Sequence, residues 1–398
     1  MYYVGIDVGK NTHAASMIDA SKQVLFKEIT FANTRDGGES VVARIRAKEE
    51  DPTQVEIGME ATGHYWLSLY SFLVEAGYKP HVINPILTDG WRKGTEIRKR
   101  KTDGIDSMLI AGLIQHREFV ETKLAEEDIN ALRTLTRFRN YLVDSTSDLK
   151  RKVLCVLDQV FPEYAGIFSD VFGKTSREVL LQYSSPADLE GVSAEQLTEL
   201  LANLSRRRCG EKQAKQLSEA ASRSFGVTFC RETFSFQLRL LLEQIGFIEQ
   251  QAAGVEKEIK ARMEKLASPI TTITGIGPIL GAIILSEIGD ISRFDNPTRL
   301  VAFAGIDASV SQSGQYEATN NHMSKRGSPY LRRALYMAAT TASNHDPELR
   351  AFYLKKKAEG KHHGVCIGAV SRKLCYIIYT ILKENRPYVK REPEASSA

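Results

Sequence analysis

Four acidic residues near the N-terminus have types and spacings that suit chemistry with divalent cations. Asp7 lies near the end of the strand-like pattern YYVGIDVG, and Glu60 ends a second such pattern, QVEIGME. If these two strands lie side by side in parallel, their carboxylates emerge at neighbouring positions on one edge of the sheet. Asp103 and Asp106 are three residues apart in a helical pattern, so they share one side of a helix. A helix laid across the sheet edge would bring all four acids together.

Gathered carboxylates repel one another and lose hydration, and divalent cations offset this cost. We therefore expect Asp7, Glu60, Asp103 and Asp106 to bind Mg²⁺ or Mn²⁺. Two such cations can flank a phosphodiester, one at the attacking oxygen and one at the leaving oxygen. Each acid alone also has a simpler explanation, because an aspartate can cap a turn and acids are favoured in the first turn of a helix.

The pattern around these acids predicts alternating strands and helices. Three strand patterns, YYVGIDVG, THAASMIDA and QVLFKEITF, are joined by short turns, as in an antiparallel meander. A helix from about residue 38 to 48, a buried strand over QVEIGMEA, a helix over YWLSLYSFLVEAG and a strand over KPHVINP follow. Gly77 and Pro80 stand where a helix C-cap and a helix stop are expected. This is the element order of the RNase H-like fold, an α/β domain with a mixed sheet.

The segment GIDVGKNTHAASMID also resembles the first phosphate loop of actin-like and sugar-kinase ATPases. Such an ATPase needs a second strand-turn-strand phosphate loop and a Gly-rich adenosine loop later in the chain. The later sequence contains helical patterns and basic clusters instead, so this ATPase is kept only as an alternative to a metal-dependent nuclease.

From Thr102 onward the pattern is mainly helical. An apolar series at alternating spacings of four and three residues forms a heptad seam, made of Leu241, Ile245, Ile248, Ala252, Val255, Ile259 and Leu266. The seam predicts a coiled coil that dimerises the protein if it is intermolecular, and packing within its own domain is the alternative. We expect a catalytic domain over 1–125, a helical and coiled-coil connector over 126–268, a mainly helical C-terminal domain over 269–385 and a flexible tail over 386–398.

Basic residues are clustered, although the net charge of the chain is only +4. Such clusters can follow the phosphates of a nucleic acid, and each alone can equally be a solvated surface. Gly275 and Gly277 lie between two apolar helical patterns, where a helix-hairpin-helix-like turn can contact DNA phosphates or simply join two helices. The basic residues expected to contact nucleic acid are Arg98, Lys99, Arg100, Lys101, Lys325, Arg326, Arg332 and Arg333.

A polar, serine-rich loop precedes a helix whose expected start is Ser328 as N-cap and Pro329 as first residue. A serine is a weak nucleophile without a base or a metal, so each serine here is first expected to form hydrogen bonds within its loop. From chemistry alone, the candidates for a nucleophile stay open among Ser309, Ser311, Ser313 and Ser324.

Six segments taken together resemble one known family. They are GIDVGK, EATGHYW, KTDGIDSMLIA, TGIGPILGAIILSEIGDISRF, AFAGIDASVSQSG and SKRGSPYLRRALYMAA. In this order, over roughly residues 1 to 125 and 269 to 345, they are similar to the DEDD insertion-sequence transposases, the IS-one-ten family. Agreement of several motifs is far more specific than any one of them. Ser107 follows Asp106 where alanine is common in that family.

The resemblance implies a RuvC-like N-terminal domain whose four acids bind magnesium. It implies a C-terminal domain in which Ser313 attacks a DNA phosphate and forms a transient phosphoserine link, with Ser311 as the neighbouring alternative. Acids of one subunit would serve the serine of another, within a dimer or a dimer of dimers. A non-coding bridge RNA would choose donor and target DNA by base pairing.

Two further functions stay open. A nuclease resembling a Holliday-junction resolvase would use the acids and water without a serine, and a non-catalytic DNA-binding protein would need neither. Five cysteines without close pairs argue against disulfides, and the spacing matches no common zinc site among His362, His363, Cys366 and Cys375. The most apolar stretch, residues 279–285, is too short to span a bilayer, so we expect a cytosolic, nucleoid-associated protein.

Overall fold

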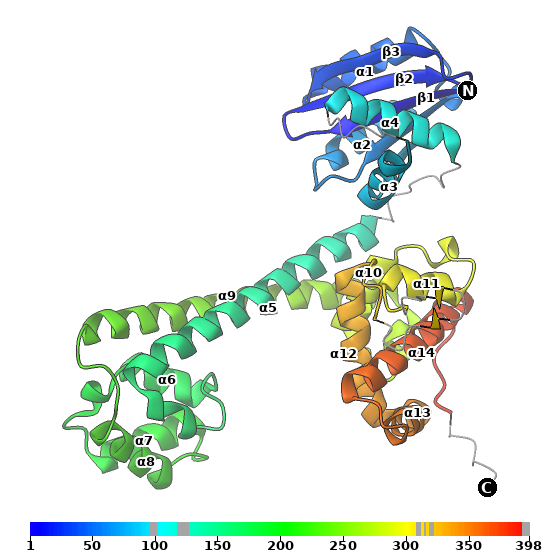
Figure 1. Cartoon of the computed structure of the whole chain (residues 1–398). Helices are drawn as coiled ribbons and strands as arrows, with labels where there is room; N and C mark the ends of the chain where they lie inside the picture. The colour runs from blue at the N-terminus through cyan, green and yellow to red at the C-terminus, as the bar shows by residue number, and fades with distance from the viewer. Residues whose placement is uncertain (96–101, 118–126, 308–311, 314–315, 318–321, 392–398) are drawn as a thin grey trace. The chain divides into compact units, whose positions relative to one another are not determined.

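The computed structural model describes the chain except residues 96–101, 118–126, 308–311, 314–315, 318–321 and 392–398. The chain divides into two compact units, Met1–Leu124 and Ala125–Ala398 (Figure 1). The first unit is a mixed α/β structure, and the second is mainly helical. The predicted boundary between connector and C-terminal domain lies inside the second unit.

The first unit contains a five-stranded sheet made of β1 (Tyr2–Val8), β2 (Thr12–Asp19), β3 (Val24–Ala32), β4 (Val55–Glu60) and β5 (Pro80–Ile83). The strand order is β3-β2-β1-β4-β5. The first three strands are antiparallel neighbours, whereas β1, β4 and β5 run parallel to one another. The five predicted strands are therefore confirmed, and they form a mixed sheet.

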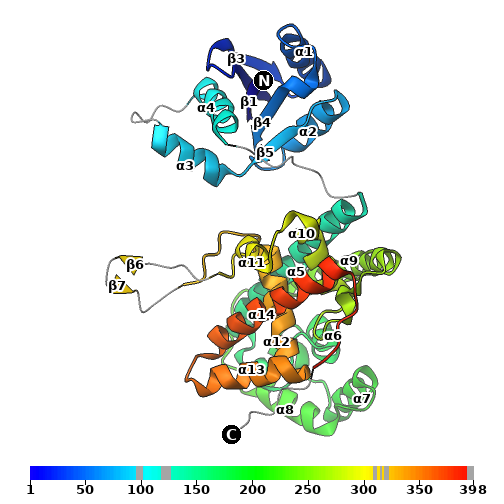
Figure 2. The same ribbon diagram turned by 90° about the vertical axis from the view of Figure 1, so that its right-hand side faces the viewer.

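Helices cover both faces of this sheet (Figure 2). On one face, α1 (Arg35–Arg46) and α2 (Trp66–Glu75) pack on alternate residues of β1, including Val4 and Ile6. On the other face, α4 (Asp103–His116) crosses the strands, with α3 (Pro85–Thr95) packed against it. Gly77, the glycine expected at the end of α2, directly follows the C-cap residue Ala76 and has a φ of +93°, so the predicted glycine stop is confirmed.

Two glycines let α4 approach the sheet closely. A Cβ atom added to Gly5 in β1 would lie 2.0 Å from the backbone oxygen of Ser107. One added to Gly58 in β4 would lie 2.7 Å from the side chain of Ile114. Ser107 also exchanges a hydrogen bond of 2.8 Å with Ser16 of β2, so the serine that departs from the family pattern has a structural partner. These contacts identify the face of β1, β2 and β4 that α4 covers.

Two long helices, α5 (Glu127–Val160) and α9 (Arg231–Leu266), run antiparallel through the second unit. One end carries α6 (Lys174–Gln182), α7 (Ala194–Ser205) and α8 (Glu211–Ser222). The other end carries α10 (Pro278–Ile288), α11 (Pro297–Ala304), α12 (Pro329–His345), α13 (Pro347–Ala358), α14 (His363–Glu384) and the short strands β6 (Gln312–Ser313) and β7 (Tyr316–Glu317). Short 3-10 helices lie at Pro52–Gln54, Pro162–Gly166, Pro186–Leu189, Pro269–Thr272 and Ile291–Arg293.

The heptad seam of α9 packs inside the chain. Leu241 and Ile245 are buried in a core shared with α5, α6, α7 and α8, and Ile259 is buried in the core shared with α10 and α12. The apolar seam of α9 is therefore explained by packing within its own domain, which was the alternative to an intermolecular coiled coil. The seam supplies no argument for an intermolecular coiled coil, and self-association stays a prediction.

The glycine turn before α10 is explained first by packing. Gly275 has a φ of +89°, and a Cβ atom there would lie 2.5 Å from the carbonyl oxygen of Ala338 in α12. Gly277 is exposed, precedes Pro278 at the start of α10, and has open space where a Cβ would stand. A DNA contact at this turn stays a prediction, because the helix-helix packing alone requires Gly275.

Within the described ranges, one helix, α14, is long and apolar enough to cross a membrane by length and composition. Ile367, Leu374 and Ile378 of this helix are buried in the C-terminal core, as in the central helix of a globular unit. His362, one of the residues considered for zinc, caps α14 by accepting a hydrogen bond from the Gly364 amide. Burial raises the pKa of the Cys375 thiol to about 12, which disfavours the thiolate that a metal would need.

Candidate carboxylate site

The register of β1 and β4 brings Asp7 and Glu60 together. The strands run in parallel with Ile6 opposite Met59, so Asp7 and Glu60 occupy the next pair of positions. Side chains alternate along a strand, so residues two apart face the same side. Gly5 faces α4, so Asp7 also faces α4. Gly58 faces α4 as well, so Glu60 faces it too. Both residues are half-buried. Two carboxylates therefore lie at neighbouring positions on one face of the sheet, as the sequence predicted.

Helix α4 begins with the other two acids. The Thr102 side chain accepts a hydrogen bond of 3.3 Å from the amide of Ile105, which fixes the first turn of α4. Asp103 and Asp106 lie in that turn, but Asp103 is exposed whereas Asp106 is 6% exposed. The two acids therefore differ in their exposure to solvent, although they lie only three residues apart in the helix.

Helix α3 connects the strand acid to the helix acid. Thr88 donates a hydrogen bond of 2.8 Å from Oγ1 to Oε2 of Glu60. Arg92, one turn later, places Nη2 at 2.9 Å from Oδ1 of Asp106. Sequence reasoning missed both residues. The available signal was their spacing of four in a helix between two acid-bearing elements, which puts both on one side of that helix.

The donor set suits a hard cation only in part. Carboxylate oxygens are the ligands that Mg²⁺ prefers, and Asp7 and Glu60 fit that requirement because they share one face and one sheet edge. Asp106 is already neutralised by the Arg92 guanidinium. Among the described residues, no three His, Cys, Asp or Glu side chains are grouped closely enough to hold a metal ion together. Binding by all four acids stays a prediction, and it would require Arg92 to leave Asp106.

The serine candidates belong to the second unit. Ser313 lies in β6, where it pairs with Tyr316 of β7; its side chain lies outside the described atoms, as do Ser309 and Ser311 entirely. Ser324 donates a hydrogen bond from Oγ to Oδ1 of Asp307, and its amide donates to the Asp307 carbonyl at 2.9 Å. Ser324 therefore has a structural role at the base of the loop.

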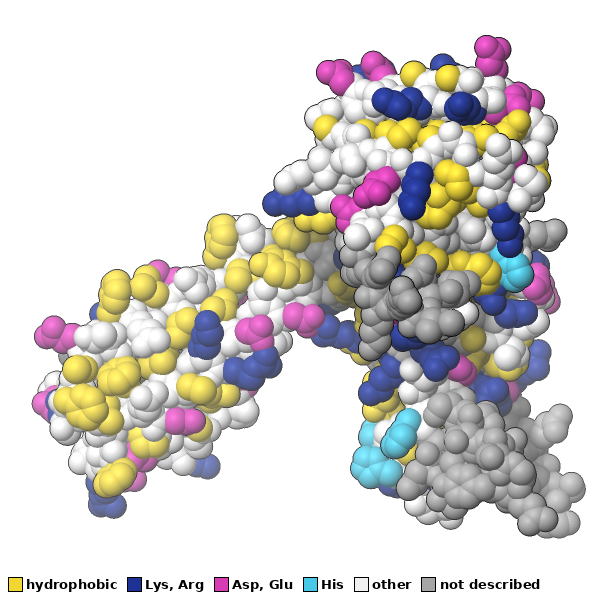
Figure 3. Space-filling model, turned by 45° about the horizontal axis from the view of Figure 1, so that its top comes forward, with side chains coloured by type: hydrophobic (Ala, Val, Ile, Leu, Met, Phe, Trp, Pro, Cys, Tyr) yellow, Lys and Arg dark blue, Asp and Glu magenta, His cyan; other side chains and the backbone are white. Residues whose placement is uncertain are grey.

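The basic residues expected to contact nucleic acid have different environments. Lys325 and Arg326 are exposed, and the cluster Arg98, Lys99, Arg100 and Lys101 lies outside the described residues. Arg332 donates to the Ala304 carbonyl at 3.4 Å, and Arg333 forms an ion pair with Asp144 of α5 at 2.8 Å. Figure 3 shows that Lys and Arg side chains on the displayed face are interspersed with acidic and apolar ones. These arginines are partly engaged in holding helices together.

A buried carboxylate organises the helices around this region. Glu287 of α10 is 4% exposed and binds Nε of Arg137 at 2.7 Å and Nη2 at 3.1 Å. The hydroxyl of Ser328, the confirmed N-cap of α12, donates to the same carboxylate at 2.8 Å. The hydrogen bonds that Arg137 donates to Glu287 raise the pKa of the Arg137 guanidinium. The network joins α5, α10 and α12, and no local sequence pattern predicts it, because its members come from three separate helices.

Comparisons with known proteins match both units. Residues 4–162 match a family model of DEDD transposases of the IS110 type, described as "Transposase", and residues 267–354 match "Transposase IS116/IS110/IS902 family". An uncharacterized 44.8 kDa protein of insertion element IS116 from Streptomyces clavuligerus is 27% identical, covering 100% of this chain and 98% of its own. The pilin gene-inverting protein of Moraxella bovis is 24% identical, covering 98% of each chain.

Proposed function

The chain belongs to the DEDD transposases of the IS116/IS110/IS902 family, and from this premise we propose how its residues cut and rejoin DNA. The protein is a DNA transposase or recombinase. We propose that the acids of the first unit and Ser313 of the second act on the same phosphodiester. The observation that most supports the part of this proposal concerning the acids is the parallel register of β1 and β4, which sets Asp7 and Glu60 side by side.

The first unit is proposed to be an RNase H-like, RuvC-like catalytic domain. The sheet order β3-β2-β1-β4-β5, with its antiparallel first three strands and parallel last two, supports this assignment. The actin-like ATPase is not supported. It requires a second strand-turn-strand phosphate loop, whereas the described residues of the second unit form helices and the short pair β6 and β7.

Asp7 and Glu60 are proposed to hold Mg²⁺ or Mn²⁺, with Asp103 and Asp106 completing the set. A bound divalent cation would activate the attacking oxygen and stabilise the leaving oxygen. Thr88 orients Glu60 by donating to Oε2 at 2.8 Å, and Thr62 donates to Oε1 at 3.4 Å. Arg92 holds Asp106 in the first turn of α4 by an ion pair. We propose that this ion pair breaks when Asp106 binds the cation.

Ser313 is proposed as the nucleophile. Its oxygen would form a bond to phosphorus as the bond from phosphorus to one strand oxygen breaks, and the leaving oxygen takes up the proton that the serine hydroxyl loses. A second strand oxygen would then attack the phosphoserine and return the proton to the serine. The exchange conserves one phosphodiester, so strands are rejoined without an external energy source.

Guidance by a bridge RNA and assembly into dimers are proposed on the family resemblance. Exposed Lys325 and Arg326 support binding to nucleic-acid phosphates. Apolar side chains along the arm formed by α5 and α9 in Figure 3 support self-association, and Phe138, Tyr141 and Phe247 are among those exposed. The name of the Moraxella relative supports recombination at chosen sites.

The direct test uses the full-length protein, its flanking genomic segment as an RNA source, supercoiled donor and target plasmids, and Mg²⁺. Ser313→Ala is expected to abolish both recombination and the covalent protein–DNA adduct seen on a denaturing gel, while the neighbouring Ser311→Ala keeps both. Recombination by Ser313→Ala at the wild-type rate would refute the serine step and favour the resolvase-like nuclease. Wild-type activity in preparations without any bound RNA would refute RNA guidance.

A further inference from the structure

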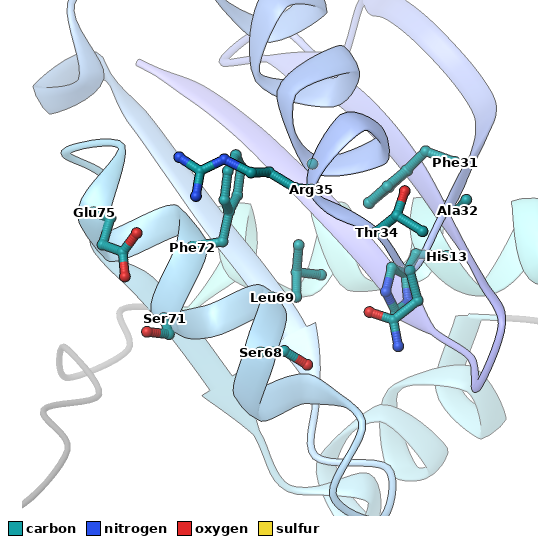
Figure 4. Close-up of a pocket in the computed structure, with 12 residues that line it drawn as sticks. His13, Phe31, Ala32, Thr34, Arg35, Ser68, Leu69, Ser71, Phe72 and Glu75 are labelled. Carbon is teal, nitrogen blue, oxygen red and sulfur yellow. The ribbon is translucent and has the colours of Figure 1, made fainter.

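A cavity of about 460 Å³ lies in the first unit between the first turn of α1 and helix α2 (Figure 4). It lies over the ends of β2 and β3, on the sheet face opposite α4, so it is separate from the carboxylate site. Its wall includes His13, Phe31, Asn33, Ser68, Ser71 and Phe72. This volume falls in the range of cavities that hold small organic groups.

His13 is the feature of this cavity that packing does not explain. The side chain is 2% exposed, and neither ring nitrogen has a hydrogen-bond partner of good geometry among the described residues. Burial lowers the pKa of His13 more than the neighbouring Asn33 side chain raises it, so the ring carries one donor and one acceptor at neutral pH. Among the described residues only the Asn33 side chain offers this ring a hydrogen bond, and a buried imidazole nitrogen left unsatisfied costs free energy unless a ligand supplies its partner.

The rest of the wall suits a flat ring with polar edges. The ring of Phe31 lies 5.1 Å from that of His13 between centroids, at 58°. Phe72 from α2 adds a second aromatic side chain, and Gly38 of α1 is required there, because a Cβ atom would lie 2.8 Å from the Phe72 ring. Ser68 and Ser71 add hydroxyl groups at the rim. Aromatic walls with hydrogen-bonding edges are how proteins hold an unstacked nucleobase.

The charges around the cavity favour a base over a phosphate. Glu75 lies in the wall, and Arg35, the basic residue that lines it, is exposed and paired with Glu39 at 3.1 Å. A phosphate inside would meet the Glu75 carboxylate, whereas the amino group of a base can donate to it.

The cavity also lies beside the end of β1 that carries Asp7. His13 pairs with Val8, the residue after Asp7. The Asn33 side chain donates to the Lys10 carbonyl at 3.1 Å, which ties the cavity wall to the turn between β1 and β2. A strand bound at the carboxylate edge would pass this turn. We propose that the cavity takes an unstacked nucleobase of the strand bound at that edge, a proposal that rests on the proposed function.

The test uses full-length protein in EDTA, so that no strand is cut, and short single-stranded DNA and RNA of one sequence with 2-aminopurine at each position in turn. We expect one position to brighten on binding, because the base leaves its stack. Ser71→Trp, which fills the cavity mouth, is expected to remove this signal and to raise Kd about tenfold. Val74→Trp, at an exposed position of α2 outside the wall, is the matched control and keeps wild-type behaviour.

Brightening with DNA alone, with RNA alone or with both identifies the strand and supports the proposal. The proposal is overturned if no position brightens, or if Ser71→Trp and Val74→Trp bind alike. His13→Gln is a second variant that leaves the cavity open, unlike Ser71→Trp. It should still weaken binding, because it removes the ring nitrogens that would bind the base. Asp7→Asn separates the two proposals: in EDTA it should brighten at the same base position as the wild type, and in a separate assay with Mg²⁺ only its failure to stop strand cutting would count against the carboxylate site.

Discussion

At the scale of single residues, the contrast between Asp106 and the pair Asp7 and Glu60 matters most. Asp106 is buried and neutralised by Arg92, whereas Asp7 and Glu60 are half-buried on a shared sheet edge. The Arg92 guanidinium contacts Oδ1 of Asp106 at 2.9 Å. If Asp106 is a metal ligand, as we propose, Arg92 competes with the cation for that carboxylate.

Removing this competitor is expected to strengthen cation binding. Arg92→Ala should lower the Kd for Mn²⁺ about tenfold, measured by electron paramagnetic resonance of free Mn²⁺. Lys93→Ala removes the neighbouring exposed pair with Asp89 and serves as the control, with no change expected. Weaker Mn²⁺ binding in Arg92→Ala would show that Arg92 supports the site.

At the scale of elements, the fit of α4 on the sheet positions two of the four acids. Gly5→Ala would place a methyl group against the Ser107 backbone and push α4 off β1. We expect a loss of about 2 kcal/mol in the free energy of unfolding, measured with urea, and loss of strand cutting. Gly90→Ala in α3 meets open space and should be neutral or stabilising. Equal stability of the two variants would contradict the close packing.

A second element-scale prediction concerns the network around Glu287. Glu287→Ala leaves Arg137 and Ser328 without their partner, and the half-exposed arginine can regain water, so a loss of about 3 kcal/mol is expected from urea unfolding. Asp144→Ala breaks the exposed pair with Arg333 and should cost less than about 1 kcal/mol. Similar losses in both variants would show that the buried network is no stronger than a surface pair.

The strands and the start of α12 were predictable because period-two alternation, a glycine C-cap and a Ser-Pro start are local signals. The pairing of Asp7 with Glu60 followed from strand order alone. The spacing of Thr88 and Arg92 puts them on one side of α3, but their partners Glu60 and Asp106 were not predictable, because these contacts depend on how α3 packs against β4 and α4. The seam of α9 was ambiguous for a similar reason: a heptad pattern is the same whether its partner is another chain or α5.

At the scale of the whole molecule, the proposed acids and the proposed serine belong to different units. If acids of one subunit serve the serine of another, mixing full-length Asp7→Asn with Ser313→Ala should restore recombination, because a mixed dimer contains one intact pair. Each variant alone is the control and should be inactive. If the two variants co-assemble but their mixture is inactive, the acids and Ser313 that act together belong to the same chain.

We propose that self-association uses the arm formed by α5 and α9. Phe247→Ser is expected to lower the dimer fraction in light scattering, because it removes an exposed apolar side chain from that arm. Leu354→Ser in α13 removes a similarly exposed residue elsewhere and should not change the dimer fraction. If the molar mass of Phe247→Ser in light scattering is unchanged, the dimer contact lies on another surface.

We propose above all that Asp7 and Glu60 bind the catalytic cation together. Crystals of the full-length protein soaked in Mn²⁺, with data collected at the manganese absorption edge, can locate this cation. We expect an anomalous peak bonded to carboxylate oxygens of both residues, on the face covered by α4. A fully occupied Mn²⁺ bound elsewhere in the chain, with none between these two carboxylates, would show that this proposal is wrong.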